Sequence, residues 1–110
     1  MASVSTHVLD TSRGIPADGV AVSLFRVDPE GRTHIASATT NPDGRIGAPL
    51  PKLEPGIYTL VFEVERYFRR FGTESFYDEI TVRFHVTDDG RHYHVPLLLS
   101  PWSYSTYRGS

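Results

Sequence analysis

The sequence predicts an all-β protein, built as an antiparallel sandwich of two sheets with one short helix. The first observation is alternation with period two. In several short runs every second residue is apolar, which is typical of strands with one buried face. The second observation is that turn-forming residues separate these runs, and short strands at this spacing favour an antiparallel sandwich. A single segment with helical spacing interrupts the alternation and predicts the helix.

The expected strands follow one another along the chain. The cleanest alternation covers 80–86, where apolar residues stand at every second position. In 58–64 the apolar positions alternate with Thr59 and Val61, which we expect on an exposed face. The strongly apolar run 93–100 is expected to be central in its sheet. Weaker patterns predict three further strands, at 5–10, 20–24 and 34–40.

Turns are expected where residues that preset φ or tolerate positive φ stand together. Five segments combine Pro, Gly, Asn or Asp in this way: 13–16, 28–31, 41–44, 54–56 and 88–90. The helix is predicted by Val64, Tyr67, Phe68 and Phe71, which fall at i, i+3, i+4 and i+7. Gly72 is expected to end this helix.

Length and composition define one domain and exclude several classes of function. The chain has 110 residues, 39% hydrophobic and 22% charged, so 1–110 is expected to be a single globular domain. A formal net charge of -2 offers nucleic acid no attraction. No apolar run approaches the roughly 20 residues of a membrane-spanning helix. Residues 1–6 lack the features of a signal peptide, so a cytoplasmic protein with no membrane partner is expected.

The chain has no cysteine, which excludes disulfides, thiolate metal sites and a Cys nucleophile. The segment 100–110 is rich in aromatic residues, and we expect it to be ordered rather than a disordered tail. Ser105 and Ser110 lack the Gly-x-Ser-x-Gly context of a hydrolase nucleophile, so a serine triad is not expected. No glycine-rich phosphate loop is present either.

His92 and His94 stand two apart on a predicted strand, so both imidazoles project from the same face. A solvent-facing pair is the commonest interpretation of such spacing. The functional alternatives are metal ligation and acid/base catalysis, because neutral imidazole binds metals and titrates near pH 7. Metal ligation is disfavoured, since no cysteine exists and no carboxylate stands nearby at ligand spacing.

His7 and Arg45 are further candidates. His7 lies in the first predicted strand, where a partly buried structural role is the commoner interpretation. Arg45 directly follows the turn 41–44, which predicts a guanidinium fixed at a strand start. A fixed guanidinium can stabilise an oxyanion or hold a planar amide edge by paired hydrogen bonds. A solvated surface arginine is the alternative.

Three segments together resemble the transthyretin-like family, and specifically its hydrolase branch. They are THVLDTSRGIPA at 6–17, TNPDGR at 40–45, and HYHVPLLLSP at 92–101 running into YSTYRGS at 104–110. The tetrapeptide Tyr-Arg-Gly-Ser is the most discriminating motif. The helix and the segment 74–77 also fit, so the resemblance covers essentially the whole chain. A mild departure is Trp102-Ser103, where the hydrolases more often have Tyr or Phe followed by Gly.

The resemblance implies a single transthyretin-like domain: an eight-stranded, two-sheet Greek-key sandwich with one short helix. It also implies a homotetramer, a dimer of dimers, with sites at the dimer-dimer interface. In this arrangement each site lies in a channel where two dimers meet, which would explain how a small chain encloses a substrate.

The implied activity is hydrolysis of 5-hydroxyisourate, a product of urate oxidation, to 2-oxo-4-hydroxy-4-carboxy-5-ureidoimidazoline. No cofactor and no metal are implied. By the same resemblance His7, Arg45, His94 and Ser110 are the catalytic positions, and Tyr107 and His92 line the pocket with His7 and Arg45 to bind a purine-derived substrate.

Two alternatives from other classes stay open. A non-enzymatic carrier of small ligands, as in transthyretin proper, would use the same channel but with an apolar lining. A purely structural sandwich would leave the polar C-terminal motif unexplained.

Overall fold

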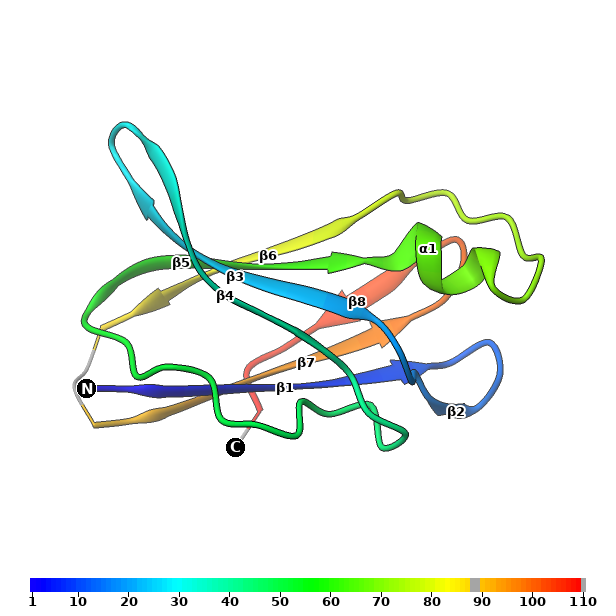
Figure 1. The fold of residues 1–110 in the computed structure, drawn as a ribbon, viewed down its shortest axis with the longest axis horizontal. Coiled ribbons are helices and arrows are strands. Elements are labelled where there is room, and N and C mark those ends of the chain that lie inside the picture. The colour runs from blue at the N-terminus through cyan, green and yellow to red at the C-terminus, as the bar shows by residue number, and fades with distance from the viewer. Residues whose placement is uncertain (88–89, 110) are drawn as a thin grey trace.

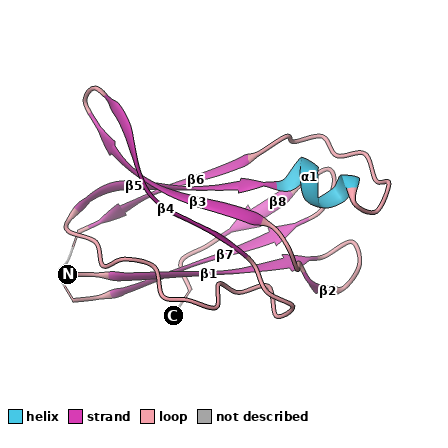
Figure 2. Cartoon of the chain, viewed as in Figure 1, coloured by secondary structure: helices cyan, strands magenta, loops and turns pink. Residues whose placement is uncertain are grey.

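The computed structural model describes residues 1–87 and 90–109 and forms two sheets packed face to face (Figures 1 and 2). The first sheet has the order β2-β1-β7-β8, with β1 at Ser3–Asp10, β2 at Ile15–Pro16, β7 at His92–Leu99 and β8 at Tyr104–Thr106. The second has the order β4-β3-β5-β6, with β3 at Ala21–Asp28, β4 at Gly31–Thr39, β5 at Gly56–Glu63 and β6 at Ile80–Val86. The helix α1 spans Val64–Arg69. The predicted eight-stranded sandwich with one short helix is confirmed for these residues, and the expected turn at 88–90 lies partly outside them.

The first sheet differs from the antiparallel expectation at its centre. β1 and β7 pair in parallel, with Ser3 opposite His92 and Asp10 opposite Leu99, and both arrows run the same way in Figure 1. Strands joined by a tight turn must be antiparallel, but these two are joined by the entire second sheet. The connection is long enough for either direction, so turn signals alone do not reveal this pairing. β7 lies inside the sheet, as predicted from its apolar sequence.

The core lies between the two sheets, and it fixes which residues of the first sheet face outward. In β1 the even-numbered residues are buried and the odd-numbered ones are half-exposed. In β7 the odd-numbered Tyr93, Val95, Leu97 and Leu99 enter the core. Burial of these apolar side chains sets the register, because a slip of one residue would turn them to solvent. The alternate positions therefore form an outward face.

β5 departs from its predicted pattern. The prediction that Thr59 and Val61 are exposed is wrong, since both are buried and every residue from Tyr58 to Phe62 is buried. β5 lies inside its sheet, between β3 and β6, so neighbouring side chains cover its second face as well. Phe25 and Arg83 stand opposite Thr59 on the two sides.

The helix follows β5 directly and ends earlier than predicted. Its last residue is Arg69, while Gly72 adopts φ 64° and completes the turn that follows. Phe71 thus lies beyond the helix and is exposed, packed under the Arg13 guanidinium at 3.7 Å from the ring centroid. Tyr67 is buried, and its hydroxyl donates to the Asp10 carboxylate at the end of β1 at 2.8 Å. This bond joins the helix to the sheet that carries the candidate site.

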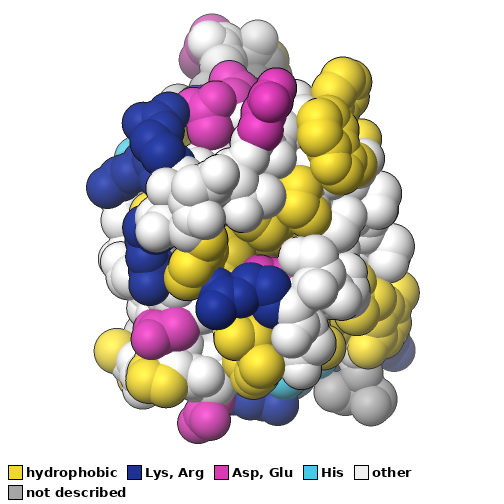
Figure 3. Space-filling view, turned by 90° about the vertical axis from the view of Figure 1, so that its right-hand side faces the viewer, with side chains coloured by type: hydrophobic (Ala, Val, Ile, Leu, Met, Phe, Trp, Pro, Cys, Tyr) yellow, Lys and Arg dark blue, Asp and Glu magenta, His cyan; other side chains and the backbone are white. Residues whose placement is uncertain are grey.

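The turn predicted after the first strand is present. The expected turn at 13–16 is a tight β1–β2 hairpin, in which Ile15–Pro16 pairs with β1 and Gly14 has φ 71°. Figure 3 views the end of the sandwich that carries α1 and this hairpin, where exposed hydrophobic side chains lie among charged ones. In the described residues the only helix is α1, and six residues are too few to cross a membrane.

Candidate active site

The outward face of the first sheet carries most of the predicted site residues. His7 lies on β1, and His92 and His94 lie on β7. The parallel register places Ser5 beside His94 and Ser3 beside His92, with His7 one step further along, beside Pro96. The prediction that His92 and His94 share a face is confirmed, because their rings stack with centroids 6.5 Å apart. Two strands that are distant in sequence thus bring three imidazoles to one face.

Arg45 joins this face from the far side of β1. It forms a β-bridge with His7, and the adjacent Gly44 carbonyl accepts a hydrogen bond of 2.8 Å from the Val8 amide. Gly44 has φ 75°, and a side chain there would collide with the Val8 carbonyl oxygen. The Asn41 side-chain oxygen accepts hydrogen bonds from the backbone amides of Asp43 and Arg45, which closes the turn. The predicted turn at 41–44 therefore holds the backbone of Arg45 against β1.

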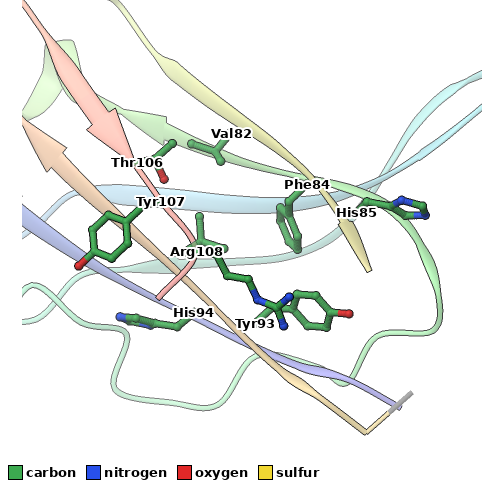
Figure 4. A pocket seen from close by; sticks show the side chains of 9 residues that line it. Val82, Phe84, His85, Tyr93, His94, Thr106, Tyr107 and Arg108 are labelled. Atoms are coloured by element: carbon green, nitrogen blue, oxygen red, sulfur yellow. The ribbon is translucent and has the colours of Figure 1, made fainter. Parts of the chain in front are cut away.

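The C-terminal segment extends the sheet on the opposite side. After β8, the Gly109 amide donates to the His94 carbonyl at 2.8 Å. The Arg108 guanidinium lies 4.6 Å from the centroid of the Tyr93 ring. Figure 4 shows Arg108 reaching over Tyr93, while Tyr107 and His94 lie on the other side of the segment. The order across the face is therefore Arg45, β1, β7 and the C-terminal segment.

Gly109 packs directly on the His94 imidazole. A Cβ atom at this position would overlap the ring carbon Cδ2 and lie 3.1 Å from Cγ. No positive φ is required here, so the reason for glycine is the close approach and not the backbone conformation. The Gly in the Tyr-Arg-Gly-Ser motif therefore has a physical role against a candidate catalytic group.

The surroundings of His94 disfavour its charged form. Its partial burial lowers the pKa below the usual value, and the positive charges of Arg45, His92 and His7 lower this pKa further. Lowering of a histidine pKa favours the neutral ring. At neutral pH His94 therefore has a lone pair available to accept a proton.

Two serines that the sequence did not single out contact the histidines. The Ser5 hydroxyl lies 2.8 Å from His94 Nδ1 and 2.8 Å from His92 Nε2, and the Ser3 hydroxyl lies 2.6 Å from His92 Nδ1. The only signal was their odd-numbered spacing with His7 on one strand. Without the register to β7, that spacing does not name a partner.

A hollow lies beside the site, between the sheets at their β6 and β8 edges (Figure 4). His94 and Tyr107 line it, together with apolar residues such as Phe84 and Tyr93. His7 and Arg45 do not line this hollow, and they lie on the open outward face. Ser110 lies outside the described residues. Within 1–87 and 90–109, no three His, Asp or Glu side chains gather closely enough to hold a metal ion.

The fold and this face together define a small two-sheet sandwich protein with a polar site on the outside of one sheet. The family model of the HIUase/Transthyretin family matches residues 4–109. The chain therefore belongs to the HIUase/Transthyretin family. A similar curated protein is the 5-hydroxyisourate hydrolase of Deinococcus radiodurans, 52% identical over 113 residues, which cover 97% of this chain and 95% of the relative.

Solved structures agree on the fold. The structure of Klebsiella pneumoniae 5-hydroxyisourate hydrolase superposes with a TM-score of 0.88 at 41% identity, over 100% of both chains. Sea bream transthyretin in complex with thyroxine superposes with a TM-score of 0.91 at 31% identity, over 97% of this chain and 94% of the other. (S)-allantoin synthase matches 99% of this chain at 41% identity with a TM-score of 0.91, and this chain spans 44% of that longer one.

Proposed function

We propose that this chain is a 5-hydroxyisourate hydrolase that opens the substrate ring at a cyclic amide carbonyl. The observation that carries the proposal is the placement of His7, Arg45 and His94 on adjacent segments of one sheet face. Relatives named 5-hydroxyisourate hydrolase, 44–52% identical over nearly the whole chain, support the same activity. The product is 2-oxo-4-hydroxy-4-carboxy-5-ureidoimidazoline, and the reaction needs no cofactor.

The chemistry requires an activated water, a counter-charge for the tetrahedral oxyanion and a proton for the leaving nitrogen. We assign His94 to water activation, because its lowered pKa keeps it neutral. Water oxygen then bonds to the carbonyl carbon as its proton passes to the imidazole. When the carbon–nitrogen bond breaks, the leaving nitrogen takes a proton from His94 or His7.

Arg45 would hold the polar edge of the substrate and stabilise the developing negative charge. Its guanidinium is exposed on the same face as the histidines, on a backbone pinned to His7. Tyr107, 59% exposed, would contact the planar substrate, and His92 would line the pocket edge. Ser110 would orient a histidine from the end of the C-terminal segment.

The site face is open in one chain, which supports the proposal of a homotetramer with sites where dimers meet. A second copy laid over Arg45 and Tyr107 would exclude water from the substrate. Sedimentation of the purified protein should give four times the 12.3 kDa of one chain. A monomer with full activity would refute this arrangement. The cytoplasmic location predicted from the sequence belongs to the same proposal.

The test of function is direct. Purified protein is mixed with freshly generated 5-hydroxyisourate, and the absorbance decay is compared with the decay in buffer and with the His94→Asn variant. Faster decay with the wild type alone supports the hydrolase. Equal decay in all three samples refutes it. Saturable binding of an apolar ligand without turnover would favour the carrier alternative.

A further inference from the structure

Three hydrogen bonds link four side chains in a row on the outward face. They run from Ser3 Oγ to His92 Nδ1 at 2.6 Å, from His92 Nε2 to Ser5 Oγ at 2.8 Å, and from Ser5 Oγ to His94 Nδ1 at 2.8 Å. The row crosses between β1 and β7 because the parallel register sets each serine opposite a histidine. Of the two histidines in the row, His92 is exposed and His94, at its end, is half-buried.

The number of donors and acceptors that each side chain offers restricts how the protons in this row can be arranged. The Ser5 hydroxyl has a single proton, and it stands between two imidazole nitrogens. If His94 donates from Nδ1 to Ser5, the Ser5 proton is free to go to His92 Nε2, and His92 Nδ1 donates to Ser3. If Ser5 donates to His94 Nδ1 instead, the neutral His94 ring carries its proton on Nε2. In both arrangements Nε2 of His94 is the nitrogen that faces a substrate, with a lone pair in the first and an N–H in the second.

We propose that Ser5 is a positioning residue that keeps the His94 proton on Nδ1, leaving Nε2 free as the base. The proposal rests on the hydrolase function proposed above. Because Nδ1 of His94 is engaged by Ser5, Nε2 is the nitrogen left to face a reacting water. The carboxylate that commonly orients a catalytic imidazole is replaced here by a neutral hydroxyl. This suits a ring that lies near the positive charge of Arg45 and must stay neutral.

The same geometry changes the expected role of His92. Both of its ring nitrogens are engaged by serine hydroxyls, so neither is left to bind a substrate. His92 therefore acts through Ser5, as the acceptor that holds the Ser5 proton away from His94. It lines the pocket edge without contacting the reacting atoms.

The tautomer of His94 is measured by NMR on protein with ¹⁵N-labelled histidine at about pH 8, above the usual imidazole pKa of about 6.5. A His94→Gln variant assigns the His94 signals. In the wild type we expect a protonated Nδ1 and an unprotonated Nε2. Ser5→Ala should shift His94 toward the Nε2–H form, and Ser5→Thr, which keeps the hydroxyl, should restore the wild-type pattern. Ser23→Ala is the matched control, because Ser23 bonds Ser37 on the other sheet. A wild-type His94 protonated on Nε2, or a pattern unchanged in Ser5→Ala, overturns the proposal.

Kinetics supply a second readout. Ser5→Ala should lower kcat about 10- to 100-fold, the scale found for groups that orient an imidazole in metal sites, with KM nearly unchanged. Ser5→Thr should recover most of kcat. A raised KM with unchanged kcat would mean that Ser5 binds substrate, and would also overturn the proposal. If the wild type shows no hydrolysis, the proposed function fails, and the NMR result alone decides whether Ser5 sets the tautomer.

Discussion

The contact between Gly109 and the His94 ring makes a sharp prediction for Gly109→Ala. The added methyl group would overlap Cδ2 of the imidazole and lie 3.1 Å from Cγ. The backbone at Gly109 cannot easily withdraw, because its amide donates to the His94 carbonyl at 2.8 Å. Either the ring must move or the C-terminal segment must leave the sheet.

The geometry gives the size of the effect. Carbon atoms settle at about 3.5–4.0 Å, so relieving this overlap requires a displacement of about 1 Å. A misplacement of about 1 Å at a catalytic group lowers the rate on the order of 100-fold. Stability should change little, because the described contacts at risk are one backbone hydrogen bond at the edge of the sandwich, about 1 kcal/mol, and the contact of the exposed Arg108 with Tyr93. The expected variant is therefore folded and nearly inactive.

The assay compares 5-hydroxyisourate decay and thermal unfolding for the wild type, Gly109→Ala and Gly47→Ala. Gly47 is the matched control, since it has no positive φ and a Cβ there would meet nothing closer than 3.9 Å. Gly47→Ala should keep wild-type activity and melting temperature. Activity of Gly109→Ala within twofold of the wild type would refute the packing argument. A loss of folding in Gly109→Ala would show instead that the segment supports the sandwich.

Five further predictions concern the site residues. His7→Asn and His94→Asn should each lower turnover by roughly 100-fold or more with folding intact, and near-normal rates in both would remove them from the mechanism. Arg45→Lys keeps the charge but loses the paired hydrogen bonds, so steady-state kinetics should show a severe loss of hydrolytic activity. Full activity of this variant would show that the guanidinium does not hold the substrate by paired hydrogen bonds. Because the pKa of His94 is lowered, the pH profile of hydrolysis should stay level down through pH 6.5 and fall only at lower pH, and a rate that already falls above pH 6.5 would contradict His94 as the base. The stability contributed by His94 is complete above the usual pKa of about 6.5 and is lost below it, because the unfolded chain then binds the proton more readily. Deleting residues 108–110, or appending a bulky tag after Ser110, should lower the rate of hydrolysis, and an N-terminal tag should lower it less. Unchanged turnover in the truncated form would show that this segment is not part of the active site.

The hydrophobic periodicity of the sequence predicts the elements whose structure depends on neighbouring residues in the chain. The strand Ile80–Val86 is found with the predicted bounds, because its alternation reflects a buried and an exposed face. The helix starts at Val64 as the spacing indicates, but it ends at Arg69. Phe71 fitted the helical period, yet its ring packs against Arg13, a contact from the β1–β2 hairpin that sequence spacing cannot express.

What escaped prediction depends on how strands are paired. Thr59 is buried because β5 lies in the interior of its sheet. The sequence of one strand does not reveal which strands will flank it, so this burial could not be predicted. The candidate site divides in the same way. His7, Arg45 and His94 are candidates from the sequence, and the family resemblance predicts their catalytic roles, while Ser3 and Ser5 are recognised only from the register that sets each beside an imidazole.

The parallel pairing of β1 with β7 has a consequence for the order of events in folding. Ser5 and His94 are separated by 89 positions in sequence, and the whole second sheet lies between them. Closing so long a loop is entropically costly, and contacts of this range form slowly. The β3–β4 and β5–β6 pairs can form from nearby segments, but the two halves of the site meet only when β7 docks beside β1. During refolding, hydrolysis should therefore recover later than the strand structure of the second sheet. The time course of enzymatic activity would then report when β7 docks beside β1.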